Sequence, residues 1–534
     1  MGLGNSRNSD ERSRVVALLA LVAGTGMATP AAAQDATWLA NPGSGDLSLG
    51  SNWSTGVAPG ASNTAFFDGS TVTTLGISAP SLTMGGWTFN SDASAYTATV
   101  TVSLAFMQGG ITVNGGSIAM LNDGGFIGFA NSATAGAASF ATQSGGATVF
   151  GMSAGTDTAT AGSASFLNVK GGTTAFQAMT NAGTATFANR FGGQTVLVDS
   201  SSAANATITN SKGGLTLFLG SAMEASAAIT NSFGGAVIFA ESSNAGNATI
   251  TNASFGGPFV GIPVGIAFLE GSAAGTATIV NNNGLTAFGS PGGPDTATAD
   301  HAQITNNVGG GTQFNAFATA GFATITINSG GAVAFFDNST GGLAQFITNG
   351  TGTVDFGSSL GPNSDGQISA GSIAGSGTYY IGSGNRLTVG GNGLSTEVSG
   401  VIADTTPCGC SPPGPGALAK TGSGTLTLSG INTYSGGTTF AGGQRHDAQA
   451  LERLYLDACA DGRWRSDARR RFRQRQHARR RDLRRRLAGR YREDGRGHAD
   501  HDRGQWLYGH DDHRERHLCA IRRGQRRGVS GRHR

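Results

Sequence analysis

The central part of this chain repeats itself about every 21 residues, and that repeat limits the folds open to it. Between about 131 and 356, a small residue precedes a β-branched or aromatic pair ten times; most steps between neighbours are 21 residues, and the longer steps of 26, 29 and 25 indicate loop insertions. Segments such as "ATIT" and "VIF" are β-branched, alternating and too short for helices, so they predict strands. A unit of this size cannot bury its own apolar face, but stacked copies can. The repeat predicts an all-β parallel β-helix, or solenoid, marked by Ala138, Ala164, Ala185, Ala206, Ala227, Ala248, Ala277, Ala302, Ala323 and Ala344.

Two columns of the repeat have a fixed residue type. Four residues after the marker comes an asparagine, in seven copies: Asn168, Asn189, Asn210, Asn231, Asn252, Asn281 and Asn306. Twelve residues after it comes a phenylalanine, with Phe288 one residue out of step: Phe150, Phe176, Phe218, Phe239, Phe314, Phe335 and Phe356. A Gly-Gly pair between the columns indicates a turn, because glycine accepts positive φ at little cost. We expect an internal phenylalanine stack and a hydrogen-bonded asparagine ladder at a turn.

Composition leaves two other classes to consider. Glycine accounts for 88 of the 534 residues but follows no Gly-X-Y rhythm, which excludes collagen. Low-complexity disorder is the wider alternative, since glycine and serine are abundant. The fixed spacing of phenylalanine argues against it, because a disordered chain needs no register.

The first 33 residues read as a signal peptide. Arg12 and Arg14 precede the apolar run "VVALLALVAGTGMA", and Ala31 and Ala33 supply the small residues of a cleavage site after Ala33. A short membrane anchor is the alternative, but the run is short and interrupted by glycine and alanine. We therefore expect export through the Sec machinery.

Two further segments flank the repeats. Residues 34–130 carry Trp38, Trp53 and Trp87 and are expected to form an N-terminal cap and the first β-rungs, because a solenoid needs a terminal unit over its open apolar end. Sugar binding by exposed tryptophan is the alternative. Residues 357–415 are expected to hold further β-rungs and a Pro/Gly linker, in which Cys408 and Cys410 give only a weak metal signal.

Charged residues give little support to a catalytic site. A β-helical polysaccharide-acting enzyme needs clustered carboxylates on one face, often with Ca²⁺ and a basic residue. The acids of the repeats are sparse and are expected not to recur at one repeat phase, and His301 is the only histidine before the tail. A lone histidine is more often incidental than catalytic, so we expect no catalytic residues, no bound metal and no cofactor. The sparse acids are Asp199, Glu224, Glu241, Glu270, Asp295, Asp300, Asp337 and Asp355.

The segment "KTGSGTLTLSGINTYSGGTT", within 416–443, closely resembles the autotransporter-associated β-strand repeat, also called the passenger-associated transport repeat. The resemblance implies a right-handed β-helical passenger of type V secretion, carried to the cell surface by an outer-membrane β-barrel, with the transport repeat assisting passenger folding and secretion. The matching positions are Lys420, Gly422, Gly424, Thr425, Leu426, Leu428, Gly430, Asn432, Tyr434, Gly436 and Thr438.

Residues 444–534 change in composition. This tail holds 27 of the 35 basic residues and contains no threonine, asparagine or lysine, so the alternating strands of the expected β-barrel translocator are absent from it. Read from the second base of each codon, the stretch from Arg492 to Leu518 is compatible with "KTGAGTLTxTGANGFTGTTT", a second copy of the motif. We therefore expect these roughly 90 residues to be out of frame through a frameshift, or otherwise disordered. A basic nucleic-acid-binding arm and a histidine-rich metal tract are the alternatives, and neither is given a role.

The sequence is compatible with three functions. The first is a non-enzymatic, exported passenger that acts as a surface scaffold or adhesin and binds a host or cell-surface ligand. The second is the β-helical enzyme, and the third is an inert secreted stalk or a truncated pseudogene product. The intact family implies the cell surface, the outer membrane or the extracellular space, whereas a chain made without its barrel is expected to remain periplasmic.

Overall fold

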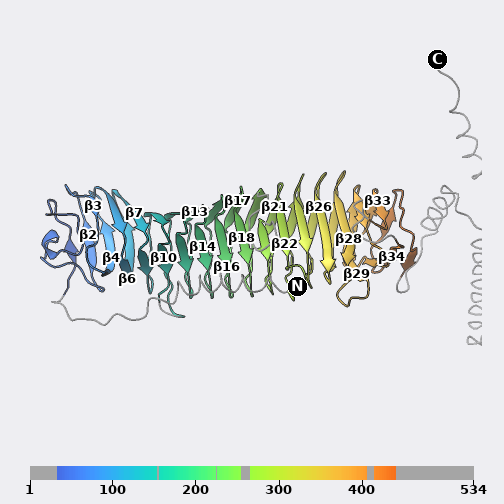
Figure 1. Ribbon diagram of the computed structural model, residues 1–534, viewed down its shortest axis with the longest axis horizontal. Coiled ribbons are helices and arrows are strands. Elements are labelled where there is room, and N and C mark those ends of the chain that lie inside the picture. Colours follow the sequence, from blue (N-terminus) through green and yellow to red (C-terminus); the bar gives the residue numbers. More distant parts are fainter. Residues whose placement is uncertain (1–32, 153–154, 224, 254–264, 406–413, 441–534) are drawn as a thin grey trace, which may run out of the picture. The chain divides into compact units, whose positions relative to one another are not determined.

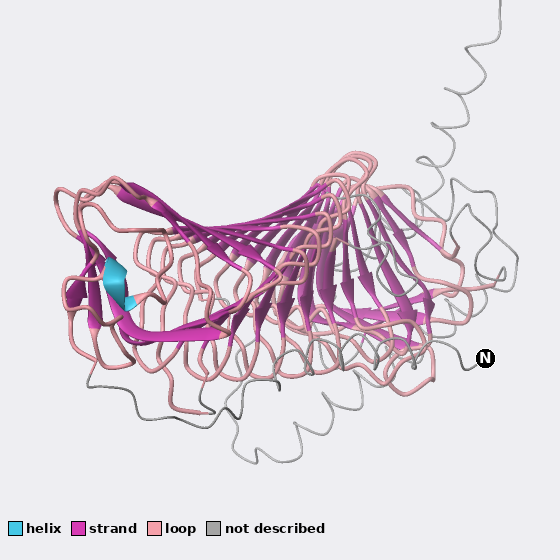
Figure 2. Ribbon diagram, turned by 60° about the vertical axis from the view of Figure 1, so that its left-hand side comes forward, coloured by secondary structure: helices cyan, strands magenta, loops and turns pink. Residues whose placement is uncertain are grey.

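The computed structural model describes residues 33–152, 155–223, 225–253, 265–405 and 414–440. All of them belong to one compact unit, which ends at 444. Within the described residues there is no α-helix, and the one helical turn is the 3₁₀ segment η1 (Gly50–Asn52). All other regular secondary structure in the described residues is strand, joined by turns and loops, as the repeat predicted (Figures 1 and 2).

A parallel β-solenoid accounts for nearly all of these strands. Each coil adds one strand to each of two sheets, and every strand pair is parallel, so residue n of one coil lies beside its equivalent in the next. The first sheet has 17 strands. In stacking order they are β1 (Ala36–Thr37), β2 (Thr64–Phe67), β4 (Ser81–Phe89), β6 (Ser103–Val113), β8 (Phe126–Phe129), β10 (Ala147–Phe150), β12 (Thr173–Phe176), β14 (Gln194–Leu197), β16 (Leu215–Phe218), β18 (Ala236–Phe239), β20 (Ile266–Phe268), β22 (Leu285–Phe288), β24 (Gly311–Phe314), β26 (Ala332–Asp337), β28 (Thr353–Ser359), β30 (Thr378–Tyr380) and β33 (Val401–Ala403).

The second sheet runs beside the first and divides near its C-terminal end. One half of β29 pairs with β31, while Gly375 at its other end pairs with β32. The branches then continue as β31–β34–β36 and β32–β35. The strands are β3 (Thr74–Leu75), β5 (Ala95–Val100), β7 (Ser117–Asp123), β9 (Ser139–Gln143), β11 (Ser165–Asn168), β13 (Thr186–Arg190), β15 (Thr207–Ser211), β17 (Ala228–Ser232), β19 (Thr249–Ala253), β21 (Thr278–Asn281), β23 (Gln303–Asn306), β25 (Thr324–Ile327), β27 (Gly341–Thr348), β29 (Gln367–Gly375), β31 (Arg386–Val389), β32 (Thr396–Val398), β34 (Ala417–Lys420), β35 (Leu426–Leu428) and β36 (Thr438–Phe440).

The phenylalanine column forms the internal stack that the sequence predicted. From Phe218 to Phe356, successive rings lie 4.6–4.9 Å apart, centroid to centroid, and are tilted by at most 14°. Phe288 regains the register because its coil has a shorter turn, so that it pairs directly with Phe268 and Phe314. Leu197 takes the ring's place in one coil. All ten marker alanines are fully buried, which lets the coil close tightly around the stack.

The asparagine ladder forms inside the coil rather than in the turn where we expected it. Each asparagine is in the second sheet just before the turn, and its side chain is fully buried. Asn189 donates from Nδ2 to Oδ1 of Asn210, which is 2.8 Å away in the next coil, and Thr195 donates to Oδ1 of Asn189. The ladder satisfies polar groups that burial would otherwise leave without partners.

Three tryptophans fill the N-terminal end of the solenoid. Trp38, Trp53 and Trp87 are each at most 2% exposed, so none offers a platform for sugars. The Trp38 and Trp53 rings meet edge to face with centroids 5.1 Å apart, and Phe67 packs against both. The indole N–H of Trp53 donates to the carbonyl of Leu47 at 3.0 Å. The aromatic cluster thus covers the apolar end of the first coils.

Candidate functional site

The transport motif forms the last described coil of the solenoid. Lys420 ends β34, Leu426 and Leu428 belong to β35, and Thr438 begins β36, which pairs back onto β34 one coil earlier. The motif therefore spans one complete turn of the coil. Its backbone adds one more coil to the repeats that precede it. The contacts of its side chains are described below.

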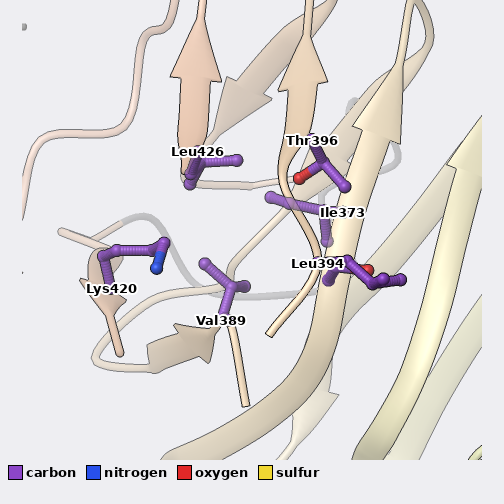
Figure 3. A pocket seen from close by; sticks show the side chains of 8 residues that line it. Ile373, Val389, Leu394, Thr396, Lys420 and Leu426 are labelled. Atoms are coloured by element: carbon purple, nitrogen blue, oxygen red, sulfur yellow. The ribbon is translucent and has the colours of Figure 1, made fainter. Parts of the chain in front are cut away.

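Lys420 occupies an inward position, directly after Val389 in the stacking order. Its side chain is 6% exposed and extends toward Val389, beside Ile373 and Leu426 (Figure 3). The ammonium group donates to the carbonyls of Thr421 and Gly422. Burial lowers the pKa of Lys420, because the charged form loses solvation there. The depression that these side chains line has no room for a water molecule, so Lys420 packs into the coil rather than opening a ligand pocket.

The glycines of the motif lie where neighbouring coils almost touch. A Cβ on Gly430 would lie 1.7 Å from the carbonyl oxygen of Gly400, and a Cβ on Gly422 would lie 1.9 Å from that of Gly390. Gly422 also has a φ of +67°, which favours glycine. Gly424 and Gly436 approach the previous coil in the same way. Any side chain at these positions forces the last coil away from the one before it.

The remaining motif residues bind the coil to itself or to its neighbour. Leu426, Leu428 and Tyr434 are partly buried against the main core. The Asn432 side chain accepts the backbone N–H of Ile402 at 2.8 Å and donates to Gly430 O.

Two further hydrogen bonds involve hydroxyl groups of the motif or of the coil before it. The hydroxyls of Tyr434 and Thr438 hydrogen-bond to each other, and the N–H of Thr425 donates to Ser395 Oγ at 3.0 Å. The motif residues named here thus all make contacts within the coil or with its neighbours.

Four acidic residues share one corner of the coil, which corrects the expectation that the acids follow no repeat phase. Each comes two residues after the stacked inward residue of its first-sheet strand and has φ between +53° and +61°: Asp199, Glu241, Glu270 and Asp337. The sequence signal was present, since three of them fall 14 residues after a marker alanine. Glu270 is displaced by the insertion at 254–264, which hid the pattern.

The carboxylates at this corner cap the backbone of the preceding coil. Asp199 accepts the N–H of Ala178 at 3.1 Å, Glu241 that of Gly220 at 2.6 Å, and Glu270 that of Glu241 at 2.9 Å. Asp337 accepts the N–H of Ala316 in the preceding coil and that of Gly292, two coils away, both at 3.0 Å. Each carboxylate is therefore engaged in joining coils.

The His301 side chain contacts a different acid, Asp300, which does not belong to the acidic corner. Its Nδ1 is 2.7 Å from Oδ1 of Asp300, and its exposed ring stacks on Phe322 with centroids 4.9 Å apart. Among the described residues, no three His, Cys, Asp or Glu side chains gather closely enough to hold a metal ion.

Several sequence-based predictions fall on parts of the chain that the structure leaves undescribed. These are Ala31 with the signal peptide before it, Glu224, Cys408, Cys410 and the tail from 444. Ala33, the other predicted cleavage residue, is the first residue described. In the part of the chain that is described, no helix is long and apolar enough to cross a membrane.

Comparison with known proteins adds one match. Residues 418–444 match the family model described as the passenger-associated-transport-repeat, over the coil built by β34, β35 and β36. No curated protein and no solved structure matches the chain. The matched repeat and the solenoid together fit a passenger of the autotransporter type, a class that is exported with the help of a translocator.

Proposed function

We propose that this chain, an autotransporter passenger by its transport repeat and its β-solenoid, acts outside the cell as a non-enzymatic scaffold or adhesin. The observation that carries the proposal is the place of the transport repeat: it is the last described coil and is continuous with the repeats before it. The solenoid presents a long, repeated outer surface, which suits display and binding.

The described acids support a structural role over a catalytic one. The carboxylates of the acidic corner accept backbone N–H groups of neighbouring coils, and the His301 ring contacts the carboxylate of Asp300, its neighbour in the chain. A carboxylate that accepts backbone N–H groups of a neighbouring coil already has a structural task in the fold. The chain is therefore proposed to need neither a metal nor a cofactor.

Surface display tests the export part of the proposal. Residues 1–443 are fused to the translocator barrel of an autotransporter and produced in a Gram-negative host, and the same residues are produced without the barrel as the control. The fused passenger should be cleaved by protease added to intact cells, and the control should be protected in the periplasm. A fused passenger that stays protected while an unrelated passenger on the same barrel is cleaved contradicts the proposal.

The proposal extends to the tail, which we hold to be read out of frame. Resequencing the gene across the codons for 440–445 tests it directly. The expected result is one missing or extra base, after which the other frame continues through further transport repeats. If the reading frame of residues 444–534 is confirmed and mass spectrometry finds tail peptides, the frameshift proposal is wrong. The tail must then be considered again as a basic binding arm.

A further inference from the structure

The turns that lead from the second sheet to the first form a column along the solenoid. In four successive coils the second residue of this turn is Lys170, Phe191, Lys212 or Phe233, each with φ near +50°. Backbone hydrogen bonds join the turns in sequence: the N–H of Lys170 donates to Phe191 O, that of Phe191 to Lys212 O, and that of Lys212 to Phe233 O, at 2.9–3.1 Å. The side chains of neighbouring coils are therefore stacked about 4.8 Å apart at their backbones.

Phenylalanine is an unusual choice for this turn. A positive φ disfavours bulky side chains, and asparagine or glycine adopts it at lower cost. Other coils fill the same position with small polar residues, Ser144 and Asn283, at φ +54° and +60°. The fold itself therefore does not require the aromatic rings of Phe191 and Phe233.

Both rings are exposed to solvent, and the Phe191 ring lies beside a positive charge. Phe191 is 58% exposed and Phe233 is 81% exposed. The Lys212 ammonium lies 5.1 Å from the centre of the Phe191 ring. Arg190, exposed at the end of β13, adds a third cation, so this corner holds three of the five basic residues between 34 and 443. Within the described residues, no ion pair with a carboxylate neutralises Lys170, Arg190 or Lys212.

The same turn is built differently in the later coils. There its first residue is an asparagine, and the side-chain amides bond to one another: Asn307 to Asn282 at 2.7 Å, Asn328 to Asn307 at 2.7 Å, and Asn349 to Asn328 at 2.9 Å. That ladder uses its polar groups internally. In the earlier coils this first position holds no asparagine, and the second position of the turn offers cations and rings to solvent.

We propose that Lys170, Arg190, Phe191, Lys212 and Phe233, the basic-aromatic corner, bind an acidic polysaccharide. Exposed rings provide flat apolar faces for the C–H faces of sugar rings, and the cations between them pair with carboxylates of the polymer. Lys170 and Lys212 are two coils apart, about 10 Å, which suits an anionic group recurring along an extended chain. The assignment of a cell-surface or host glycan as this polymer rests on the proposed function, whereas the binding chemistry does not.

Lysine footprinting reports on this surface residue by residue, because the arginine-rich tail contains no lysine. The chain has only three lysines, Lys170, Lys212 and Lys420, so acetylation followed by mass spectrometry reports on two corner positions and one distant internal reference. The full-length protein is labelled alone and with polygalacturonate, dextran, polyglutamate or single-stranded DNA. Polygalacturonate should slow the labelling of Lys170 and Lys212 several-fold relative to Lys420, dextran should have no effect, and polyglutamate should protect less.

A matched pair of variants separates ring-dependent binding from general attraction of a polyanion. Phe191→Asn/Phe233→Asn removes both rings, keeps both lysines and places asparagine where its backbone preference fits. Phe322→Asn removes a ring of similar exposure, 57%, from another part of the coil. The double variant should lose the protection by polygalacturonate, and Phe322→Asn should keep it.

Three results overturn the proposal. They are equal labelling with and without polygalacturonate, protection that survives in the double variant, and protection by single-stranded DNA that equals or exceeds that by polygalacturonate. Because the measurement uses purified protein in solution, each of these results leaves the surface-display test of export unaffected.

Discussion

The first coils and the last described coil of the solenoid close in different ways. At the N-terminal end, Trp38, Trp53 and Trp87 are buried and cover the stack of coils with an aromatic cluster. At the other end, the transport repeat makes a coil in which Leu426, Leu428 and Tyr434 are only partly buried. Large buried side chains stabilise the N-terminal end. At the other end, glycines allow the backbone of the last coil to approach that of the coil before it. In a nearest-neighbour fold such as this, each end is expected to respond to mutation locally.

The largest effect should come from truncating an aromatic residue of the N-terminal cluster. Trp53→Ala removes a buried indole, its contacts with Trp38 and its hydrogen bond to Leu47. Such truncations cost about 3–5 kcal/mol of stability. Hydrogen exchange should accelerate in β1, β2 and β4 and remain unchanged from β20 onward. Acceleration spread evenly over both regions contradicts the local response.

A methyl group in the transport repeat should loosen the opposite end. Gly430→Ala drives a Cβ against the carbonyl of Gly400, backbone against backbone, and overpacking of this kind costs about 1–3 kcal/mol. Gly76→Ala is the matched control, because a Cβ there meets nothing within 4 Å. Limited proteolysis should cut the last coil of Gly430→Ala faster and leave the Gly76→Ala protein unchanged. Equal cleavage of the two variants refutes the close-approach explanation.

Breaking the asparagine ladder in the middle of the solenoid should let its two ends unfold independently. Asn210→Leu leaves the Asn189 amide and the Thr216 hydroxyl without their bonds to residue 210, and each lost buried partner costs about 1–3 kcal/mol. Thermal unfolding followed by hydrogen exchange should then resolve two transitions, one on each side of β15. The exposed Asn247→Ala, which loses one bond to Ser226, should retain a single transition. One shared transition in Asn210→Leu argues against the ladder as the coupling element.

The smallest expected effect is a difference in pH response between the two ends. Burial alone would raise the pKa of Asp46, but hydrogen bonds from Ser78 and Ser48 leave it below its ordinary value of 3.8. Its stabilising contribution is therefore present above pH 3.8 and is lost as the pH falls through the lowered value. Burial lowers the pKa of Lys420, so the unfolded chain binds this proton more tightly, and the last coil gains stability as the pH rises toward 10.5.

Exchange rates measured across pH test this difference. Asp46→Asn should remove the acid-dependent change in β3 and its neighbours, and Lys420→Met should remove the alkaline change in β34–β36. If each substitution leaves its own pH profile unchanged, the titrating groups have been assigned wrongly.

Much of the fold was accessible from sequence because the repeat has one period. The spacing of the marker alanines and of Phe218, Phe239 and Phe335 defined the strands and their stacking, and the structure confirms the internal stack. The asparagine column was recognised but placed in the turn, since sequence cannot tell a turn side chain from one just before it that points inward. The acidic corner was missed because an insertion shifted Glu270 out of phase.

The motif of the transport repeat could also be recognised from sequence, but the packing of its residues could not. Sequence identified Gly422 and Gly430 as motif positions, but their close approach to carbonyls of the previous coil is a property of the folded chain. The inward direction of Lys420 was likewise not predictable, because a lysine at the end of a strand normally points to solvent.

The most direct test compares two one-coil deletions in the passenger fused to a translocator barrel. Deleting 418–437 removes the transport coil and brings Thr438 into the place of Leu418, its ladder partner. Deleting 207–227 removes one 21-residue central coil and brings Ala228 into the place of Thr207, so the register is kept. The account predicts that protease-accessible passenger on intact cells falls strongly in the first deletion and little in the second. Equal surface yields from the two deletions would contradict the claim that the transport coil makes this solenoid a secreted passenger.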